Sequence, residues 1–186
     1  MTLQKAGTEI DYTITYLEMA ARPSFDYTRL PIGSSAALLK ASDPPVWYFL
    51  SLYDAVGRDY AWEDQHSLPT EDVKAQLSRS EIFTLIDHGW PHGFFMLQDA
   101  DEGVAELVYF GLVPEAVGSG LGNWLLKTAI LMAWDREGTK KMIVDTCTLD
   151  HPRALALYQK NGFMPVRREN AKRVLTRDRD LSRIPS

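Results

Sequence analysis

The chain has 186 residues, 45% apolar and 24% charged, which is the composition of one ordinary globular domain with a sizeable core. The net charge of −5 argues against general nucleic-acid affinity, and the longest apolar runs, VWYFL and AILMAW, are far too short to cross a bilayer. The single cysteine excludes an internal disulfide, and the start MTLQKAGTEIDYT has no apolar signal-peptide core, so we expect a cytoplasmic protein.

The first part of the chain predicts one strand, an irregular segment and two helices. Alternating β-branched and aromatic residues indicate a strand at 10–19, and the prolines of 20–45 indicate irregular backbone. Apolar residues at helical spacing predict a helix from about Val46, weakening at Gly57. Thr70, followed by two acidic residues, is typical of a helix cap, so a short helix should run to about residue 80.

The second part predicts an antiparallel meander followed by alternating helices and strands. Three strand-like segments, at 82–87, 93–98 and 104–113, are joined by short turns. The pattern then predicts, in order, a helix at 121–137, a strand at 142–149, a helix at 152–161 and a strand at 163–169. A right-handed crossover would make the strands at 104–113 and 142–149 parallel neighbours.

Charge is unevenly distributed along the chain. From Arg167 onward there are seven Lys or Arg and three Asp or Glu, a net +4, so the first 166 residues carry −9. Such a tail could contact an anionic ligand, but a solvated or frayed terminus is the more common outcome and is what we expect.

The stretch PEAVGSGLGNWLL, residues 114–126, places Gly118, Gly120 and Gly122 where a strand leads into a helix. A helix N-terminus carries unpaired N–H groups and a partial positive charge, and glycine lets an anion approach them. The loop therefore predicts a phosphate or pyrophosphate cradle, although the residues alone also allow a tight turn without a ligand. The spacing fits neither a P-loop nor a dinucleotide fingerprint, because Asn123 stands where the latter needs glycine.

YFGLVPEAVGSGLGNWLL, followed after one strand by DHPRALALYQKNGF, resembles the GNAT superfamily of acyl-CoA-dependent N-acyltransferases. The resemblance implies a single α/β domain of the α+β type over 1–186. Its mixed, mainly antiparallel sheet would be splayed at the parallel strand pair and flanked by helices. Within it, 104–169 would be the cofactor-binding core, 20–81 the acceptor-binding region and 170–186 the basic tail.

The resemblance also implies acetyl-CoA, or coenzyme A, as co-substrate. Its pantetheine arm would enter between the strand ending at Val113 and the one beginning near Met142. Val117 replaces the Arg or Gln usual in the family, and His151 stands where Asn is common. The residues that the resemblance assigns to the cofactor are Leu112, Val113, Val117, Gly118, Ser119, Gly120, Leu121, Gly122, Asn123 and His151.

Two side chains are candidates for acid–base catalysis. Neutralising an alkyl amine with a pKa of ~10.4 at pH 7 costs about 4.6 kcal/mol, so a positioned base is useful. Glu106 resembles the strand glutamate that is the base in some family members, and a merely ion-paired glutamate is the alternative. Tyr158 matches the family tyrosine that protonates the leaving thiolate, and a core tyrosine is the alternative. The N–H of Val113 would polarise the thioester carbonyl.

Two weaker patterns are not expected to carry chemistry. Cys147 lies near His151, but on a buried-looking strand, where cysteine acts as a small apolar residue rather than a nucleophile. His88 and His92 have metal-like spacing, but they lie in a turn with only Asp87 nearby, so no metal site is expected.

The acceptor is expected to be a primary amine on a small molecule. The aromatic residues of 47–62 suit an apolar pocket, and Asp54, Asp59, Glu63 and Asp64 suit a cationic amine. A protein lysine or N-terminal amine is the second choice, and a non-catalytic acyl-CoA-binding regulatory domain is the third. No nucleic-acid or membrane partner is expected, and because many relatives pair, a homodimer is an option.

Overall fold

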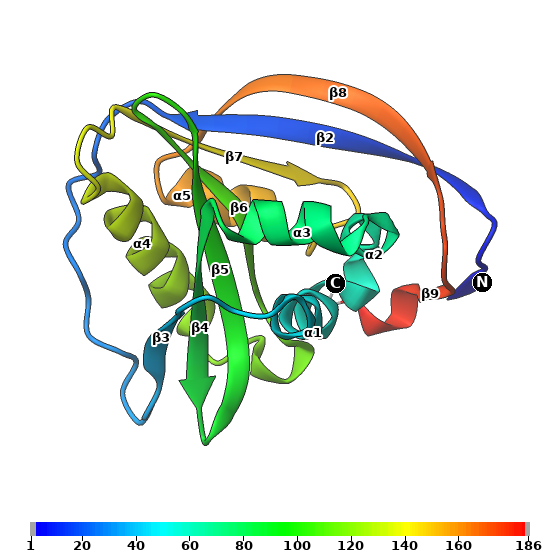
Figure 1. Cartoon of the computed structure of the whole chain (residues 1–186), viewed down its shortest axis with the longest axis horizontal. Helices are drawn as coiled ribbons and strands as arrows, with labels where there is room; N and C mark the ends of the chain where they lie inside the picture. Colours follow the sequence, from blue (N-terminus) through cyan, green and yellow to red (C-terminus); the bar gives the residue numbers. More distant parts are fainter. Residues whose placement is uncertain (1–2, 185–186) are drawn as a thin grey trace.

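Seven strands form one mixed sheet in the order β3-β4-β5-β6-β7-β2-β8 in a computed structural model that describes residues 3–184 (Figure 1). Every neighbouring pair in this sheet is antiparallel except β6 and β7, which are parallel. The predicted mainly antiparallel α/β fold is therefore confirmed. Residues 1–2 and 185–186, at the two ends of the predicted domain and tail, lie outside the described part.

The strands of the large sheet are β2 (Glu9–Met19), β3 (Ala37–Ala41), β4 (Ser80–Asp87), β5 (Trp90–Asp101), β6 (Val104–Leu112), β7 (Lys141–Cys147) and β8 (Met164–Val174). A separate pair joins β1 (Leu3–Gln4) to β9 (Arg179–Asp180). The α-helices are α1 (Val46–Gly57), α2 (Asp64–Ser67), α3 (Thr70–Leu77), α4 (Leu121–Trp134) and α5 (Ala154–Lys160).

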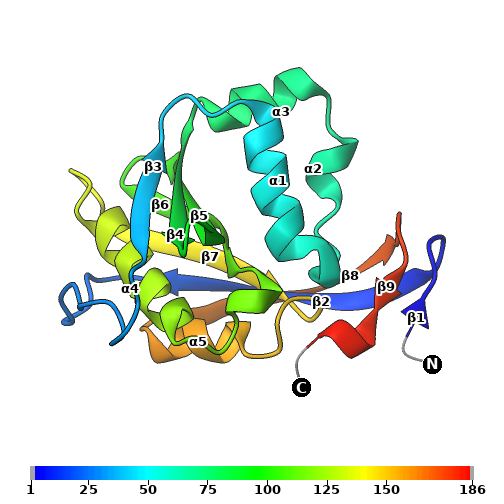
Figure 2. The same cartoon turned by 90° about the horizontal axis from the view of Figure 1, so that it is seen from below.

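Each face of the sheet is covered by its own helices. On β4 and β5, Phe83 and Phe95 pack with α4 in one buried cluster, while Ile82 and Phe94 pack with α1 and α3 in another. Successive residues of a strand point to opposite faces, so this division follows from the sequence alternation. Figure 2 shows α1, α2 and α3 on one side of the sheet, away from α4 and α5.

Most predicted elements are present, but some details differ. β3 lies inside the segment expected to be irregular. Pro69, not Thr70, is the cap residue of α3, and no side chain caps that helix. α4 ends at Trp134, before the expected 137, and α5 begins at Ala154 rather than 152.

The parallel pair separates soon after it forms, which confirms the expected splay. β6 and β7 are in register only from Val104 opposite Lys141 to Glu106 opposite Ile143. Two residues beyond Glu106, β6 carries a β-bulge at Val108, because Leu107 and Tyr109 face consecutive residues of β5. A bulge increases local twist and bends the strand, and the C-terminal half of β6 runs without a partner on its β7 side.

The basic tail is folded against the acidic segment 54–64, so the expectation of a solvated terminus is wrong. Arg177 bonds to Asp54 at 2.8 Å and to the carbonyl of Trp62, and Arg173 bonds to Asp64 at 2.8 Å. Further tail contacts run from Arg179 to the carbonyls of Asp59 and Leu149, from Arg177 to the carboxylate of Glu63, and from Arg183 to the carboxylate of Asp59. These acids are therefore neutralised within the chain.

Candidate active site

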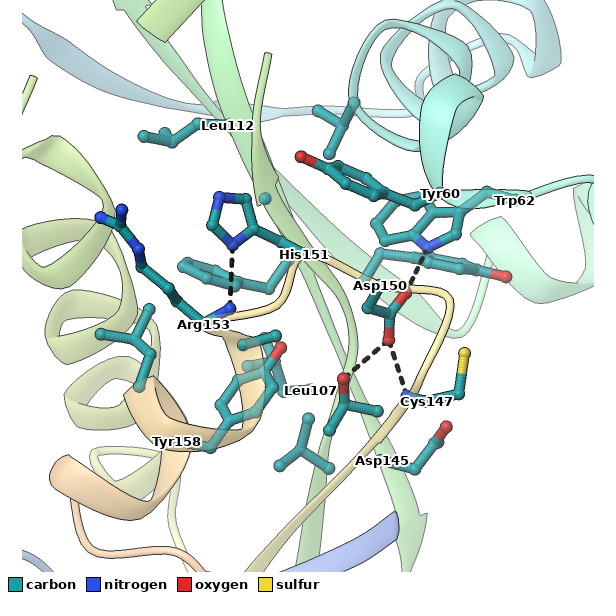
Figure 3. Close-up of a pocket in the computed structure, with 18 of the residues that line it drawn as sticks. Tyr60, Trp62, Leu107, Leu112, Asp145, Cys147, Asp150, His151, Arg153 and Tyr158 are labelled. Carbon is teal, nitrogen blue, oxygen red and sulfur yellow. Dashed lines mark hydrogen bonds between the residues drawn. The ribbon is translucent and has the colours of Figure 1, made fainter. Parts of the chain in front are cut away.

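A cavity of about 670 Å³ occupies the gap between the splayed strands. Its walls come from β6 and β7, from the loop before α4, from the start of α5 and from residues 53–64 (Figure 3). Of the predicted site residues, these line it: Glu106, Leu112, Val117, Gly118, Gly120, Gly122, Asn123, His151 and Tyr158. Val113, Ser119 and Leu121 do not line it, since Val113 and Leu121 are buried in the two cores.

The loop before α4 presents free backbone donors to this cavity. Gly118 and Gly120 have φ of +90° and +82°, which side chains disfavour. Ser119 accepts from the N–H of Leu121 through its hydroxyl, at 3.3 Å. Within residues 3–184, no acceptor bonds to the N–H groups of Gly118, Gly120, Gly122 or Asn123. Together with the positive end of the α4 dipole, these groups suit a diphosphate.

The backbone of β6 presents different groups from those expected. The N–H of Val113 donates to the carbonyl of His92 at 3.0 Å, so it is not free to polarise a thioester. Hydrogen bonding alternates along an antiparallel pair, which directs the backbone groups of Phe110 and Leu112 away from β5, toward the gap. The backbone groups that face the gap are therefore those of Phe110 and Leu112, and not the N–H of Val113.

Tyr158 reaches the cavity from α5 with its ring held in the core. The ring packs edge-on against Phe110 and Phe163, with centroids 6.1 and 5.9 Å apart. Burial, followed by the charges of Asp150 and Asp145, raises the pKa of Tyr158 well above its usual value. The phenol is therefore protonated at neutral pH and can donate.

Two carboxylates face the gap, and the sequence analysis identified only one of them. Glu106 accepts from the side-chain amide of Gln98 at 2.6 Å. Asp145, on β7, also lines the cavity, and burial together with the charges of Asp150 and Glu106 raises its pKa to about 6. Among the described residues, neither Glu106 nor Asp145 forms an ion pair. A cation entering the cavity would meet both.

Asp150 holds the end of β7 in place. Its carboxylate accepts from the Trp62 indole at 3.1 Å, from the Thr146 hydroxyl at 2.7 Å and from the N–H of Cys147 at 2.8 Å (Figure 3). Burial, and then the charge of Asp150, raises the pKa of Cys147 to about 12. Because the thiolate is the nucleophilic form, this disfavours a covalent role for the cysteine.

His151 and Arg153 lie where α5 meets the cavity. The Nδ1 of His151 accepts from the N–H of Arg153 at 3.1 Å, so the imidazole is bonded to the backbone just before α5 (Figure 3). Burial and the neighbouring Arg153 lower the pKa of His151, which favours a neutral ring. Arg153, which the sequence analysis missed, adds a cation to the wall that carries the free N–H groups.

The acetyltransferase (GNAT) family model matches residues 49–163, more than half of the chain. The chain therefore belongs to the GNAT acetyltransferase family, whose co-substrate is acetyl-CoA. No curated protein sequence matches it significantly. No described helix is both long and apolar enough to span a bilayer. The cytoplasmic location and the homodimer stay predictions.

Solved structures share the fold at low sequence identity. A GCN5-related N-acetyltransferase from Kribbella flavida is 17% identical over 86% of this chain and 56% of its own, with a TM-score of 0.57. One from Sphaerobacter thermophilus is 14% identical over 93% and 53%, with a TM-score of 0.60. A GNAT acetyltransferase from Elizabethkingia anophelis with acetyl-CoA bound is 20% identical over 71% and 78%, with a TM-score of 0.53. This chain spans just over half of the first two.

Asp145 should make the stability of the fold pH-dependent. Its folded pKa of about 6 exceeds the ordinary value of ~3.9, so its protonated form stabilises the fold below about pH 4. That contribution is lost as the pH rises through 6. In urea unfolding, the free energy of unfolding of Asp145→Asn, measured relative to that of the parent, should therefore rise between pH 4 and 6. Above pH 6 this difference should be constant. A constant difference between pH 4 and 6 would contradict the shifted pKa.

Proposed function

We propose that this chain transfers an acetyl group from acetyl-CoA to a primary amine by direct attack in a ternary complex. The observation that carries the proposal is the set of free N–H groups on Gly118, Gly120, Gly122 and Asn123, at a cavity that Tyr158 and two carboxylates also line. In this proposal, residues 104–169 bind the cofactor, and 53–64, within the predicted acceptor region 20–81, form part of the acceptor wall.

The loop and β6 fit the two polar parts of coenzyme A. The free N–H groups of residues 118–123 would hold its diphosphate, with Arg153 adding a positive charge. The unpaired backbone of Phe110 and Leu112 would bond to the amides of the pantetheine arm, as an added strand bonds to a sheet edge. When bound, acetyl-CoA would supply an activated thioester.

The acyl oxygen needs a donor that is already in place. An N–H of β6 facing the gap, on Phe110 or Leu112, would provide it, because the neighbouring residues pair with β5 and hold the strand in place beside a partly apolar cavity. Preorganised backbone donors of this kind cost no reorganisation during the reaction.

The acceptor must lose a proton before or during attack. Asp145 has a pKa of about 6, close enough to neutrality to accept a proton efficiently, and Glu106 lies near enough for its charge to raise that pKa. We assign proton removal to this pair, with Asp145 as the group that titrates near working pH.

The departing thiolate needs a proton in return. Tyr158 would provide it, because its hydroxyl reaches the cavity and its raised pKa keeps it protonated. In water a phenol (pKa ~10) is already a weaker acid than a thiol (pKa ~8.5), and burial raises the pKa of Tyr158 further, so the transfer is uphill and depends on desolvation of the thiolate in the same cavity.

The acceptor class follows from charge and shape. Glu106 and Asp145 form no ion pair in residues 3–184, whereas Asp54, Asp59, Glu63 and Asp64 are taken up by the tail arginines. A cationic amine would be drawn to the first two carboxylates rather than to the acidic helix segment. The enclosed volume suits a small molecule better than a folded protein surface, and a flexible lysine side chain is the second choice.

Gly122→Ala should separate folding from cofactor binding. Gly122 is helical, so alanine there should leave the fold as stable or up to about 1 kcal/mol more stable. A methyl at this position would lie 3.5 Å from Leu112, in the mouth of the splay, and should weaken coenzyme A binding about tenfold. Calorimetry with coenzyme A measures this, with Lys127→Ala on the same helix as control. Unchanged affinity for coenzyme A would mean that the diphosphate does not bind at this loop.

Tyr158→Phe should lower turnover about 10²-fold with little change in acetyl-CoA affinity, because only the proton donor is removed. Release of free thiol from acetyl-CoA across a panel of polyamines, amino acids, aminoglycosides and peptides measures turnover. Unchanged turnover in the variant would remove Tyr158 from the mechanism. Binding of acetyl-CoA without thiol release for any amine of the panel would favour the non-catalytic acyl-CoA-binding alternative.

The two carboxylates can be told apart by the pH dependence of kcat/KM. If Asp145 is the titrating base, the parent should lose activity below about pH 6, and Asp145→Asn should abolish that acidic limb. Glu106→Gln should shift the limb to lower pH, since it removes one charge that raises the pKa of Asp145. A limb lost in Glu106→Gln and kept in Asp145→Asn would make Glu106 the base.

A further inference from the structure

A second group of ligating side chains lies at the tip of the β4–β5 hairpin, at the lower end of these strands in Figure 1. Asp87 ends β4, His88 is in the turn, and His92 lies near the start of β5. Their potential ligand atoms all lie within 4.8 Å of one another. Asp87 and His92 are only 5% and 8% exposed, whereas His88 is exposed. None of the three lines the acyl-transfer cavity.

One ring nitrogen of His92 is bonded to the backbone, which leaves the other nitrogen free to coordinate. Its Nδ1 lies 3.2 Å from the carbonyl oxygen of Trp90, an acceptor, so Nδ1 carries the proton and Nε2 keeps its lone pair. The imidazole also packs against the Trp90 ring, with centroids 3.8 Å apart. A backbone carbonyl bonded to one ring nitrogen is the usual way in which proteins fix the other nitrogen toward a metal.

Asp87 is a buried carboxylate without a Lys or Arg partner among the described residues. One oxygen accepts from the Ser35 hydroxyl at 2.8 Å and from the N–H of His88 at 3.0 Å. The other oxygen accepts only a long bond of 3.4 Å from Ser34. Buried carboxylates are generally paired or coordinate a metal, so this second oxygen has coordinating capacity left.

The turn itself departs from its usual sequence. His88 and Gly89 have φ of +50° and +85° between the paired residues Asp87 and Trp90, which is a two-residue hairpin turn with two left-handed positions. Asn-Gly is the preferred sequence there, and histidine pays a conformational cost. A residue kept in a strained conformation beside a buried carboxylate and an oriented imidazole suggests a role for its side chain.

We propose that Asp87, His88 and His92 bind one divalent transition-metal ion, with Zn²⁺ as the best match to two imidazoles and a carboxylate. Ligands about 2 Å from zinc in a tetrahedron are about 3.3 Å apart. The exposed ring of His88 would move inward to reduce the present separation of the ligand atoms, which is up to 4.8 Å, to this value, and water would be the fourth ligand. The expectation of no metal came from the turn, yet the turn brings these ligands together.

The ion would have a bracing role. The carbonyl of His92 accepts from the N–H of Val113, so the site is one hydrogen bond from the end of β6. Ser34 and Ser35 precede β3, in the segment where Pro31 approaches Gly120. A bound ion would tie this segment and the hairpin to the strand end beside the acyl-transfer cavity, independently of the proposed reaction.

The test uses the full chain without a histidine tag, after chelation, titrated with Zn²⁺ by calorimetry and with Co²⁺ by visible absorption. The parent should bind one ion, show cobalt bands typical of nitrogen and oxygen ligands, and melt at higher temperature with zinc. In His88→Asn the turn has its preferred Asn-Gly sequence, so without metal the variant should melt at the same temperature as the parent or higher. It should bind Zn²⁺ at least tenfold more weakly than the parent. Asp87→Asn should change the cobalt spectrum.

His66→Asn is the matched control, because His66 is partly exposed and lies on α2, paired with Asp54. It should bind zinc as the parent does. The proposal is overturned if the parent binds no stoichiometric ion, or if His88→Asn binds as tightly as the parent. Neither measurement involves acetyl-CoA, so failure here leaves the acyl-transfer proposal untouched.

Discussion

The pairing of β6 with β7 ends after three residue pairs, and the functional architecture depends on that early end. A longer ladder would fill the gap with backbone hydrogen bonds and leave no room for a cofactor arm. Because the strands diverge, the backbone of Phe110 and Leu112 lacks a partner, Asp145 turns toward an opening, and α4 and α5 bring their first turns to the same rim. The groups proposed to bind the cofactor and those proposed to bind the acceptor thus both lie at the gap between the splayed strands.

Local patterns predicted the parts of this arrangement that are local in origin. The meander, the helix after the glycine loop and the free donors of Gly118–Asn123 follow from alternation, helical spacing and positive φ. The role of Val113 was wrong for a physical reason. The bulge at Val108 shifts the alternation by one, and a period-two pattern contains no sign of a bulge, so which amides face the gap could not be derived from sequence.

Long-range contacts account for most of what remained. The sequence showed an acidic segment and a basic tail, but it did not show that Arg173 and Arg177 would pair with Asp64 and Asp54. Because of these pairs, the negative charge proposed to attract the acceptor comes from Glu106 and Asp145 and not from the acidic segment. Asp145 was overlooked because an isolated acidic residue on a strand is usually a solvent-exposed residue without a catalytic role. Its importance arises from the gap opposite it, which only the three-dimensional arrangement reveals. β3 was hidden by the prolines before and after it.

The position of β2 between β7 and β8 has a consequence for how the chain folds. β2 pairs with β7 on one side and with β8 on the other, joining residues whose separation reaches 165 positions, from Glu9 to Val174. Pairings of such high contact order form slowly. During synthesis β2 cannot complete its pairing until β7 and β8 have emerged from the ribosome. The half-made sheet keeps an unpaired edge until then, which exposes it to premature association.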